Sequence, residues 1–125
     1  MAIRKDRNMS ASKSREHFLG INGSTKMNCA QAVIAGFKDK FSIGDEAIAK
    51  FASFGGGKAP KGRCGALHAA QFILGGSQTR EAKKCEEIFL HAAGSSKCKE
   101  IRALKKLSCL GCVEKSAEIL ERIQF

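Results

Sequence analysis

The chain has 125 residues, of which 43% are hydrophobic and 27% are charged. This length and balance favour one globular domain with a single core. The formal charge of +10 at pH 7 is spread over several segments. No apolar run approaches the length of a membrane-spanning helix, so we expect no membrane contact.

Six cysteines are the most informative feature of the composition. Secreted scaffolds stapled by disulfides are usually shorter and richer in cysteine, and the start "MAIRKDRNMSASKSREHF" lacks the apolar core of a signal peptide. We therefore expect a cytoplasmic protein, in which clustered cysteines more often serve metal or redox chemistry. The eight phenylalanines fall at core-like helical spacings and not among the basic residues, so we do not expect nucleic acid as a partner.

The hydrophobic pattern predicts an all-α fold, a compact bundle of five to six short helices. A disordered basic N-terminus is expected at residues 1–13, followed by a single helical domain over residues 14–125. After a short helix at about 14–19 and a loop at 20–28, the expected helices are 28–40, 45–54, 63–74, 80–93, 97–107 and 111–123. The expected helix-starting residues are Thr25 or Asn28, Ser42 or Asp45, Thr79, and Ser95 or Ser96. Glycines at 55–57, 75–76 and 94 mark expected helix ends.

Five of the six cysteines lie in or beside the first turn of a predicted helix: Cys29, Cys64, Cys98, Cys109 and Cys112. The unpaired N–H groups and the positive end of a helix favour the thiolate over the thiol. The thiolate is the form that attacks a disulfide or binds a metal. Positive charge near these thiols is expected from Lys26, Arg63, Lys97 and Lys99. These five cysteines are therefore the candidate catalytic residues.

The sixth cysteine and the closely spaced pair near the C-terminus have different interpretations. Cys85 lies in the middle of a predicted helix, on an apolar face with Ile88 and Phe89, and we interpret it as a core residue. Cys109 and Cys112 form C-x-x-C, which is typical of a redox dithiol or of half a metal site. The pattern leaves open whether Cys109 or Cys112 is the functional thiol.

His68 lies four residues after Cys64 and hence on the same helical face. It is a candidate base for the thiol or a candidate metal ligand. The tentative ligand set is Cys29, Cys64, Cys98, Cys109 and His68, and the metal would be zinc or an iron–sulfur cluster. The loop "GGGKAPKG" is not a phosphate-binding P-loop, because no Gly-Lys-Ser/Thr follows at the required offset.

An ordered set of motifs resembles the C_GCAxxG_C_C family over about residues 14–123. The motifs are "NCAQAV", "FGGG" followed shortly by "CGALHAA", then "SSKCKEIR" and "CLGCVEKSAEIL". Proteins of this family are described as redox-active and carry four characteristic cysteines. The resemblance places these four on Cys29, Cys64, Cys98 and Cys109, and it implies redox chemistry. Cys112 then occupies a position that need not be cysteine.

The leading hypothesis is a cysteine-based redox protein. It would cycle thiols and disulfides or carry electrons through a cysteine-bound metal centre, with a redox protein or a small thiol as its partner. Two alternatives stay open: a basic helical binding module with structural cysteines, and a metal-storage or delivery protein. The leading hypothesis requires Cys64 to lie near at least one of Cys29, Cys98, Cys109 and Cys112. In an up-and-down bundle Cys109 would start at the opposite end, unless the turn "SCLGC" brings it back.

Overall fold

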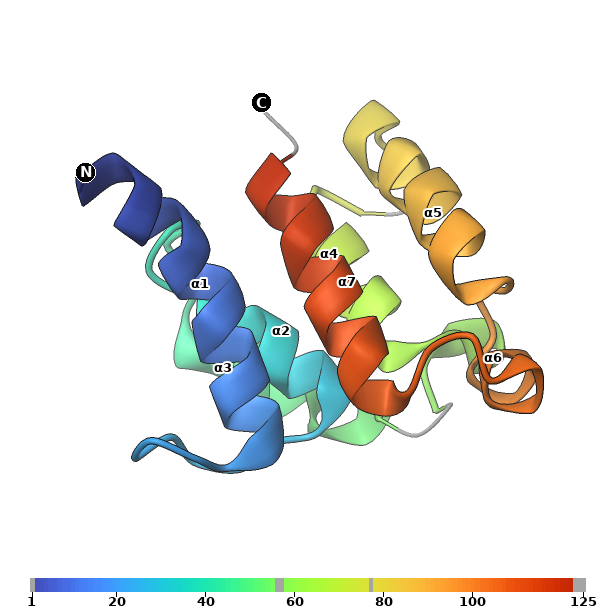
Figure 1. Ribbon diagram of the computed structural model, residues 1–125, viewed down its shortest axis with the longest axis horizontal. Coiled ribbons are helices and arrows are strands. Elements are labelled where there is room, and N and C mark those ends of the chain that lie inside the picture. Colours follow the sequence, from blue (N-terminus) through green and yellow to red (C-terminus); the bar gives the residue numbers. More distant parts are fainter. Residues whose placement is uncertain (1, 56–57, 77, 123–125) are drawn as a thin grey trace.

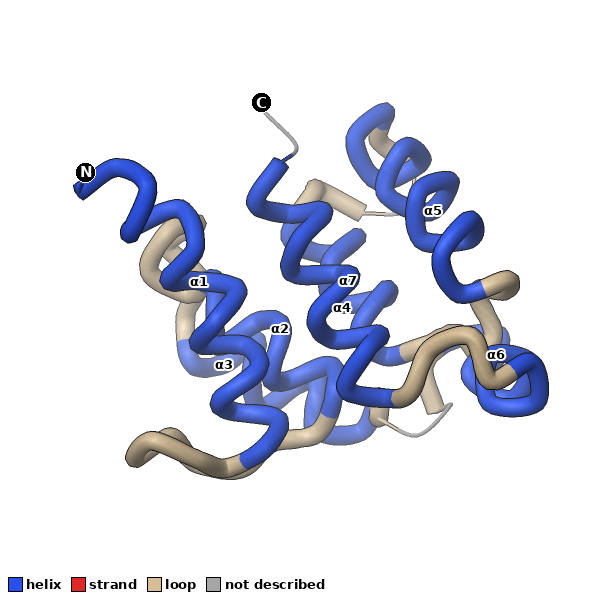
Figure 2. Tube along the Cα trace, viewed as in Figure 1, coloured by secondary structure: helices blue, strands red, loops and turns tan. Residues whose placement is uncertain are grey.

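The computed structural model describes residues 2–55, 58–76 and 78–122, which form α-helices and two short 3-10 helices and contain no β-strand (Figures 1 and 2). The elements are α1 (Ala2–Leu19), α2 (Cys29–Phe37), α3 (Asp45–Lys50), η1 (Phe51–Phe54), η2 (Pro60–Gly62), α4 (Gly65–Ile73), α5 (Arg80–Ala93), α6 (Cys98–Leu104) and α7 (Cys109–Arg122). The all-α prediction is confirmed. The described residues form seven α-helices, so the predicted count of five to six is too low.

The first helix accounts for the difference in count. The sequence predicts disorder over residues 1–13 and a short helix after it, whereas α1 runs without interruption from Ala2 to Leu19. Its middle packs closely on α2, where the Ser14 hydroxyl donates a hydrogen bond to the carbonyl oxygen of Val33 at 3.4 Å. A Cβ atom on Gly36 would collide with Ser14, so glycine at this position permits the contact. Helices gain most of their stability from such packing, which a weakly periodic sequence does not reveal.

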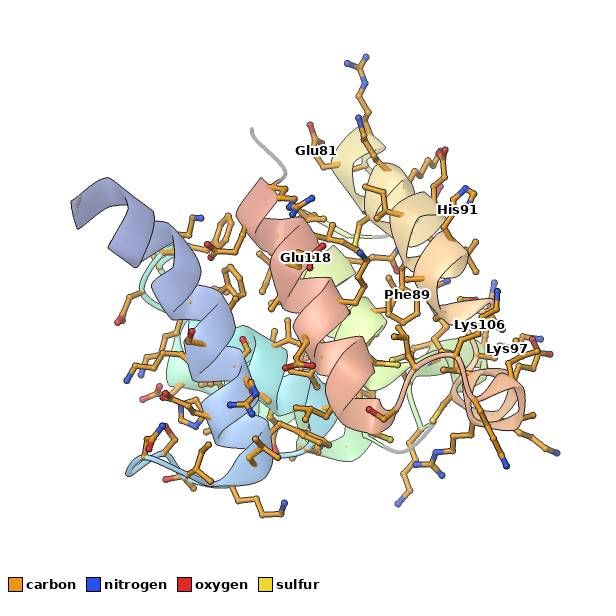
Figure 3. All side chains as sticks on the ribbon, in the orientation of Figure 1. Glu81, Phe89, His91, Lys97, Lys106 and Glu118 are labelled. Carbon is orange, nitrogen blue, oxygen red and sulfur yellow. The ribbon has the colours of Figure 1, made fainter. Side chains whose placement is uncertain are left out.

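Helix α7 occupies the centre of the molecule. It contacts α1, α2, α4 and α5, and Figure 1 shows it between α1 and α5, with α2 and α4 behind. Figure 3 shows the buried side chain of Phe89 on α5 directed toward α7. The largest fully buried apolar side chains are Phe37, Phe51, Phe89, Ile34, Leu67 and Leu120. Within the described residues, no helix has both the length and the apolar character needed to cross a bilayer.

Several predicted helix boundaries are confirmed by their caps. Asn28 caps α2 through a capping box with Gln31, and Thr79 caps α5 by accepting a hydrogen bond from the N–H group of Ala82. Gly94 ends α5 in the left-handed conformation, with φ of 84°. The residues that precede α3 and α6 are Gly44 and Lys97, not the predicted serines or Asp45. The predicted glycines 56–57 and helix end at 123 lie outside the described residues.

Candidate functional site

Five of the six cysteines line one cavity, located where several helices begin. The lining residues are Cys29, Cys64, Gly65, Cys98, Ile101, Arg102, Leu107, Ser108, Cys109 and Cys112. Three of these cysteines are the first residues of α2, α6 and α7, and Cys64 directly precedes α4. Cys112 lies one turn into α7, which begins two residues before its predicted start. The predicted placement of thiols in or beside first helical turns is therefore confirmed.

The position of Cys64 is fixed by contacts on both sides. Its N–H group donates a hydrogen bond to the carbonyl oxygen of Ser96 at 2.7 Å. The preceding residue, Arg63, pairs with the carboxylate of Glu86 and donates to the side-chain oxygen of Gln71 at 2.6 Å. Arg63 therefore anchors the start of α4 to α5. The sequence predicted that its charge would act beside the thiol, but its guanidinium is directed to this network.

Cys29 reaches the cavity because the start of α2 lies very close to the start of α4. The Asn28 side chain caps α2 and also donates hydrogen bonds to two carbonyl oxygens of η1, the nearer at 2.9 Å. A Cβ atom on Gly65 would lie 2.5 Å from the carbonyl oxygen of Phe54 and 2.9 Å from Sγ of Cys29. Any larger residue at position 65 would therefore push the two helix starts apart.

Cys98 and Cys109 reach the same cavity because the chain reverses between α6 and α7. Helix α6 has only seven residues and ends at Leu104, and the next residue, Lys105, takes the left-handed conformation with φ of 58°. The Ser108 hydroxyl then accepts a hydrogen bond from the N–H group of Gly111 at 2.9 Å, in the manner of a helix cap. The turn at "SCLGC" thus returns the chain, and Cys109 begins at the cavity instead of at the opposite end.

Cys64 and Cys112 both line the cavity, and each is only 4% exposed. The hydrogen bond from the Cys112 thiol, helped by the N–H groups of Leu67 and Ala66, outweighs burial and lowers the pKa of Cys64 to about 7. The same hydrogen bond, then burial and the neighbouring thiols, raise the pKa of Cys112 far above its usual value. Near neutral pH, Cys64 therefore carries the negative charge of the pair and Cys112 keeps its proton.

Arg102 is the residue of this site that the sequence analysis missed. Its Nη2 donates a hydrogen bond to Sγ of Cys109 at 3.7 Å, and this contact, followed by the nearby Cys98, raises the pKa of Arg102. Burial raises the pKa of Cys98, and the charge of Arg102 opposes that effect. Arg102 follows Cys98 by four residues, and this spacing on a helix could have identified it. The cations expected from the sequence do not line the cavity: Lys26, Arg63, Lys97 and Lys99.

Two other singled-out residues lie away from the cavity lining. His68 packs against the rings of Phe51 and Phe54, with centroid distances of 5.4 and 5.1 Å. Burial, followed by nearby cations, lowers its pKa. Cys85 is fully buried in α5, and burial, followed by the charge of Glu86, raises its pKa to about 12. These surroundings agree with the interpretation of Cys85 as a core residue.

The cysteines of the cavity share its lining without converging on one point. Among the residues that the structure describes, no three histidine, cysteine, aspartate or glutamate side chains are placed to hold one metal ion. A structural zinc site needs four such ligands, with sulfurs about 2.3 Å from the ion. The tentative ligand His68 points into an aromatic cluster with Phe51 and Phe54. The residues present therefore do not fit the expected metal centre in this arrangement.

Comparison with known proteins gives one match. A family model described as "Putative redox-active protein (C_GCAxxG_C_C)" matches residues 27–123, which include all six cysteines. No curated protein matches the chain, and no solved structure matches it either.

Proposed function

Since the chain belongs to the C_GCAxxG_C_C family of redox-active proteins, we propose that it is a two-electron thiol redox protein in which Cys64 and Cys112 cycle between dithiol and disulfide. The observation that carries this proposal is the burial of these two cysteines against one cavity, where Cys112 lowers the pKa of Cys64. It gives one sulfur the charge of a nucleophile and leaves the other protonated beside it. A pair of purely structural cysteines has no need of such a difference.

The proposed cycle has two halves. In the oxidative half, the Cys64 thiolate and the Cys112 thiol lose one proton and two electrons and form an S–S bond. A two-electron oxidant, either a disulfide or a hydroperoxide, accepts the electrons. In the reductive half, a thiolate of a partner redox protein or of a small thiol attacks the S–S bond, and a second partner thiolate resolves the mixed disulfide. The partner leaves as a disulfide and the Cys64–Cys112 dithiol is restored.

The other cavity cysteines provide the route to the partner. Cys109 is exposed and Cys29 and Cys98 are half-buried, whereas the inner pair is buried. A bulky partner thiol therefore meets the outer cysteines first. We assign to them the transfer of the disulfide outward, by exchange steps in which one thiolate attacks and another leaves. This assignment gives a role to all four cysteines of the family pattern, with Cys112 as an additional member.

The alternatives have less support. A cysteine-bound zinc or iron–sulfur centre, or a metal-storage role, requires ligands that converge on one ion, and the described residues do not do so. In a basic binding module, the difference in protonation between Cys64 and Cys112 would have no function. We place the protein in the cytoplasm, where a reducing thiol pool can regenerate the dithiol.

The test is to map the disulfide that forms on oxidation. The reduced protein is treated with diamide, which converts neighbouring thiols to disulfides, and the products are identified by mass spectrometry of unreduced peptides. We expect a Cys64–Cys112 link that dithiothreitol reverses. The Cys85→Ala variant serves as the control and should give the same link. Recovery of both Cys64 and Cys112 as free thiols in the folded, oxidised protein would refute the proposal, and stoichiometric metal in protein purified under anaerobic conditions would favour the metal alternative.

A further inference from the structure

The size of the cavity restricts what can reach Cys64. The space open to the centre of a water molecule inside it is about 20 Å³. This is a small space, with room for a few water molecules and none for a peptide. Cys64 is only 4% exposed, and its side chain lines this cavity. A disulfide carried by a peptide or a protein does not fit beside its sulfur.

We propose that the oxidant of the Cys64–Cys112 pair is a hydroperoxide of the size of hydrogen peroxide, selected by a cavity that has room for only a few water molecules. This inference rests on the proposed function and names its substrate class. The two oxygens of hydrogen peroxide are separated by a single bond, so the molecule needs only slightly more space than water. Bulky organic hydroperoxides and peptide disulfides exceed that space.

The chemistry balances with the residues of the cavity. The Cys64 thiolate attacks one oxygen of hydrogen peroxide, the O–O bond breaks, and the products are a Cys64 sulfenic acid and hydroxide. The Cys112 thiol then attacks the sulfenic sulfur, an S–S bond forms, and water leaves with the thiol proton. Two electrons have passed from the two sulfurs to the peroxide. Because Cys64 and Cys112 line the same cavity, the thiol that performs the second step is already at the site of the first.

Arg102 supplies positive charge where the reaction releases an anion. Its side chain lines the cavity together with the cysteines, and its guanidinium donates to Sγ of Cys109 at 3.7 Å. A cation in the lining of the cavity stabilises negative charge that develops there in the transition state. The other lining side chains without sulfur are apolar or small: Gly65, Ile101, Leu107 and Ser108.

The experiment compares oxidants of different size on the reduced protein. Hydrogen peroxide, cumene hydroperoxide and oxidised glutathione are added at equal concentration. The Cys64–Cys112 disulfide is quantified by mass spectrometry after acid quench, with Cys85→Ala as the control variant. We expect hydrogen peroxide to form this disulfide at least about tenfold faster than either bulky oxidant, the discrimination typical of a tight pocket. In the Cys112→Ala variant, hydrogen peroxide should leave a Cys64 sulfenic acid that dimedone captures, and Cys64→Ser should abolish that adduct.

The outcomes separate this inference from the function on which it rests. Equal rates with all three oxidants, or a faster reaction with oxidised glutathione, would overturn the hydroperoxide assignment. If diamide still forms the Cys64–Cys112 disulfide in that case, the dithiol function stands and its oxidant is a disulfide that reaches the pair through the outer cysteines. If diamide also fails to form the link, the proposed function itself is wrong.

Discussion

Replacing Cys112 by alanine removes the thiol whose hydrogen bond lowers the pKa of Cys64. A hydrogen bond to a charged group contributes about 1.5 to 3 kcal/mol, and a thiol is a weak donor, so the lower end of this range applies. Since 1.36 kcal/mol corresponds to one pKa unit, we expect the pKa of Cys64 to rise from about 7 to about 8 in Cys112→Ala. The N–H groups of Ala66 and Leu67 remain and prevent a larger rise.

The assay is the ultraviolet absorbance of the thiolate as a function of pH. Each protein is measured against the same protein carrying Cys64→Ser, so that the difference reports Cys64 alone. Cys112→Ser is the matched control, because its hydroxyl still donates and should keep the pKa of Cys64 closer to that of the unchanged protein. An unchanged pKa in Cys112→Ala would refute the claim that this hydrogen bond sets the charge of Cys64.

Three further predictions concern the surroundings of the cavity. Gly65→Ala should destabilise the fold by about 1 to 3 kcal/mol in chemical denaturation, because its Cβ would overlap Cys29; an unchanged stability would contradict the close approach of α2 and α4. Cys85→Ala should cost about 0.5 to 3 kcal/mol yet leave diamide oxidation unaltered, and lost oxidation would return Cys85 to the site. Despite burial, the hydrogen bond from Arg63 lowers the pKa of Glu86, so its contribution to stability is present above pH 4.5 and is lost as pH falls through the lower folded value. Glu86→Gln should therefore flatten the fall in unfolding free energy below pH 4.5, and an unaltered acid profile would argue against the ion pair.

Local signals in the sequence predicted most helix boundaries correctly. Asn28, Thr79 and Gly94 act within one turn of their own position, so their roles can be recognised without knowledge of the fold. The same holds for the cysteines at helix starts. Only the last part of α1 was predicted, as a short helix at about 14–19, because the contact of α1 with Gly36 is tertiary and the polar residues before it show no helical periodicity.

The composition of the site was partly predictable and its pairing was not. Helix starts identified the five candidate cysteines, but the partner of Cys64 depends on how α4 meets α7. The C-x-x-C spacing pointed to Cys109 with Cys112, whereas the structure splits them into one exposed and one buried thiol. Arg63 is the opposite case. It directly precedes Cys64 in the chain, but no local pattern indicated that its guanidinium pairs with Glu86.

The separation of Cys64 and Cys112 along the chain links oxidation to folding. A disulfide between them closes a loop of about 50 residues, which in the chain-entropy model disfavours the unfolded state by about 4 kcal/mol. A disulfide between Cys109 and Cys112 closes only one turn and has far less effect on the unfolded ensemble. Because folding favours the Cys64–Cys112 disulfide by the same free energy, the reduction potential of this two-electron couple is lower in the folded protein by roughly 90 mV. Formation of the proposed disulfide would thus raise the melting temperature of the whole domain, and heating the domain would favour its reduction.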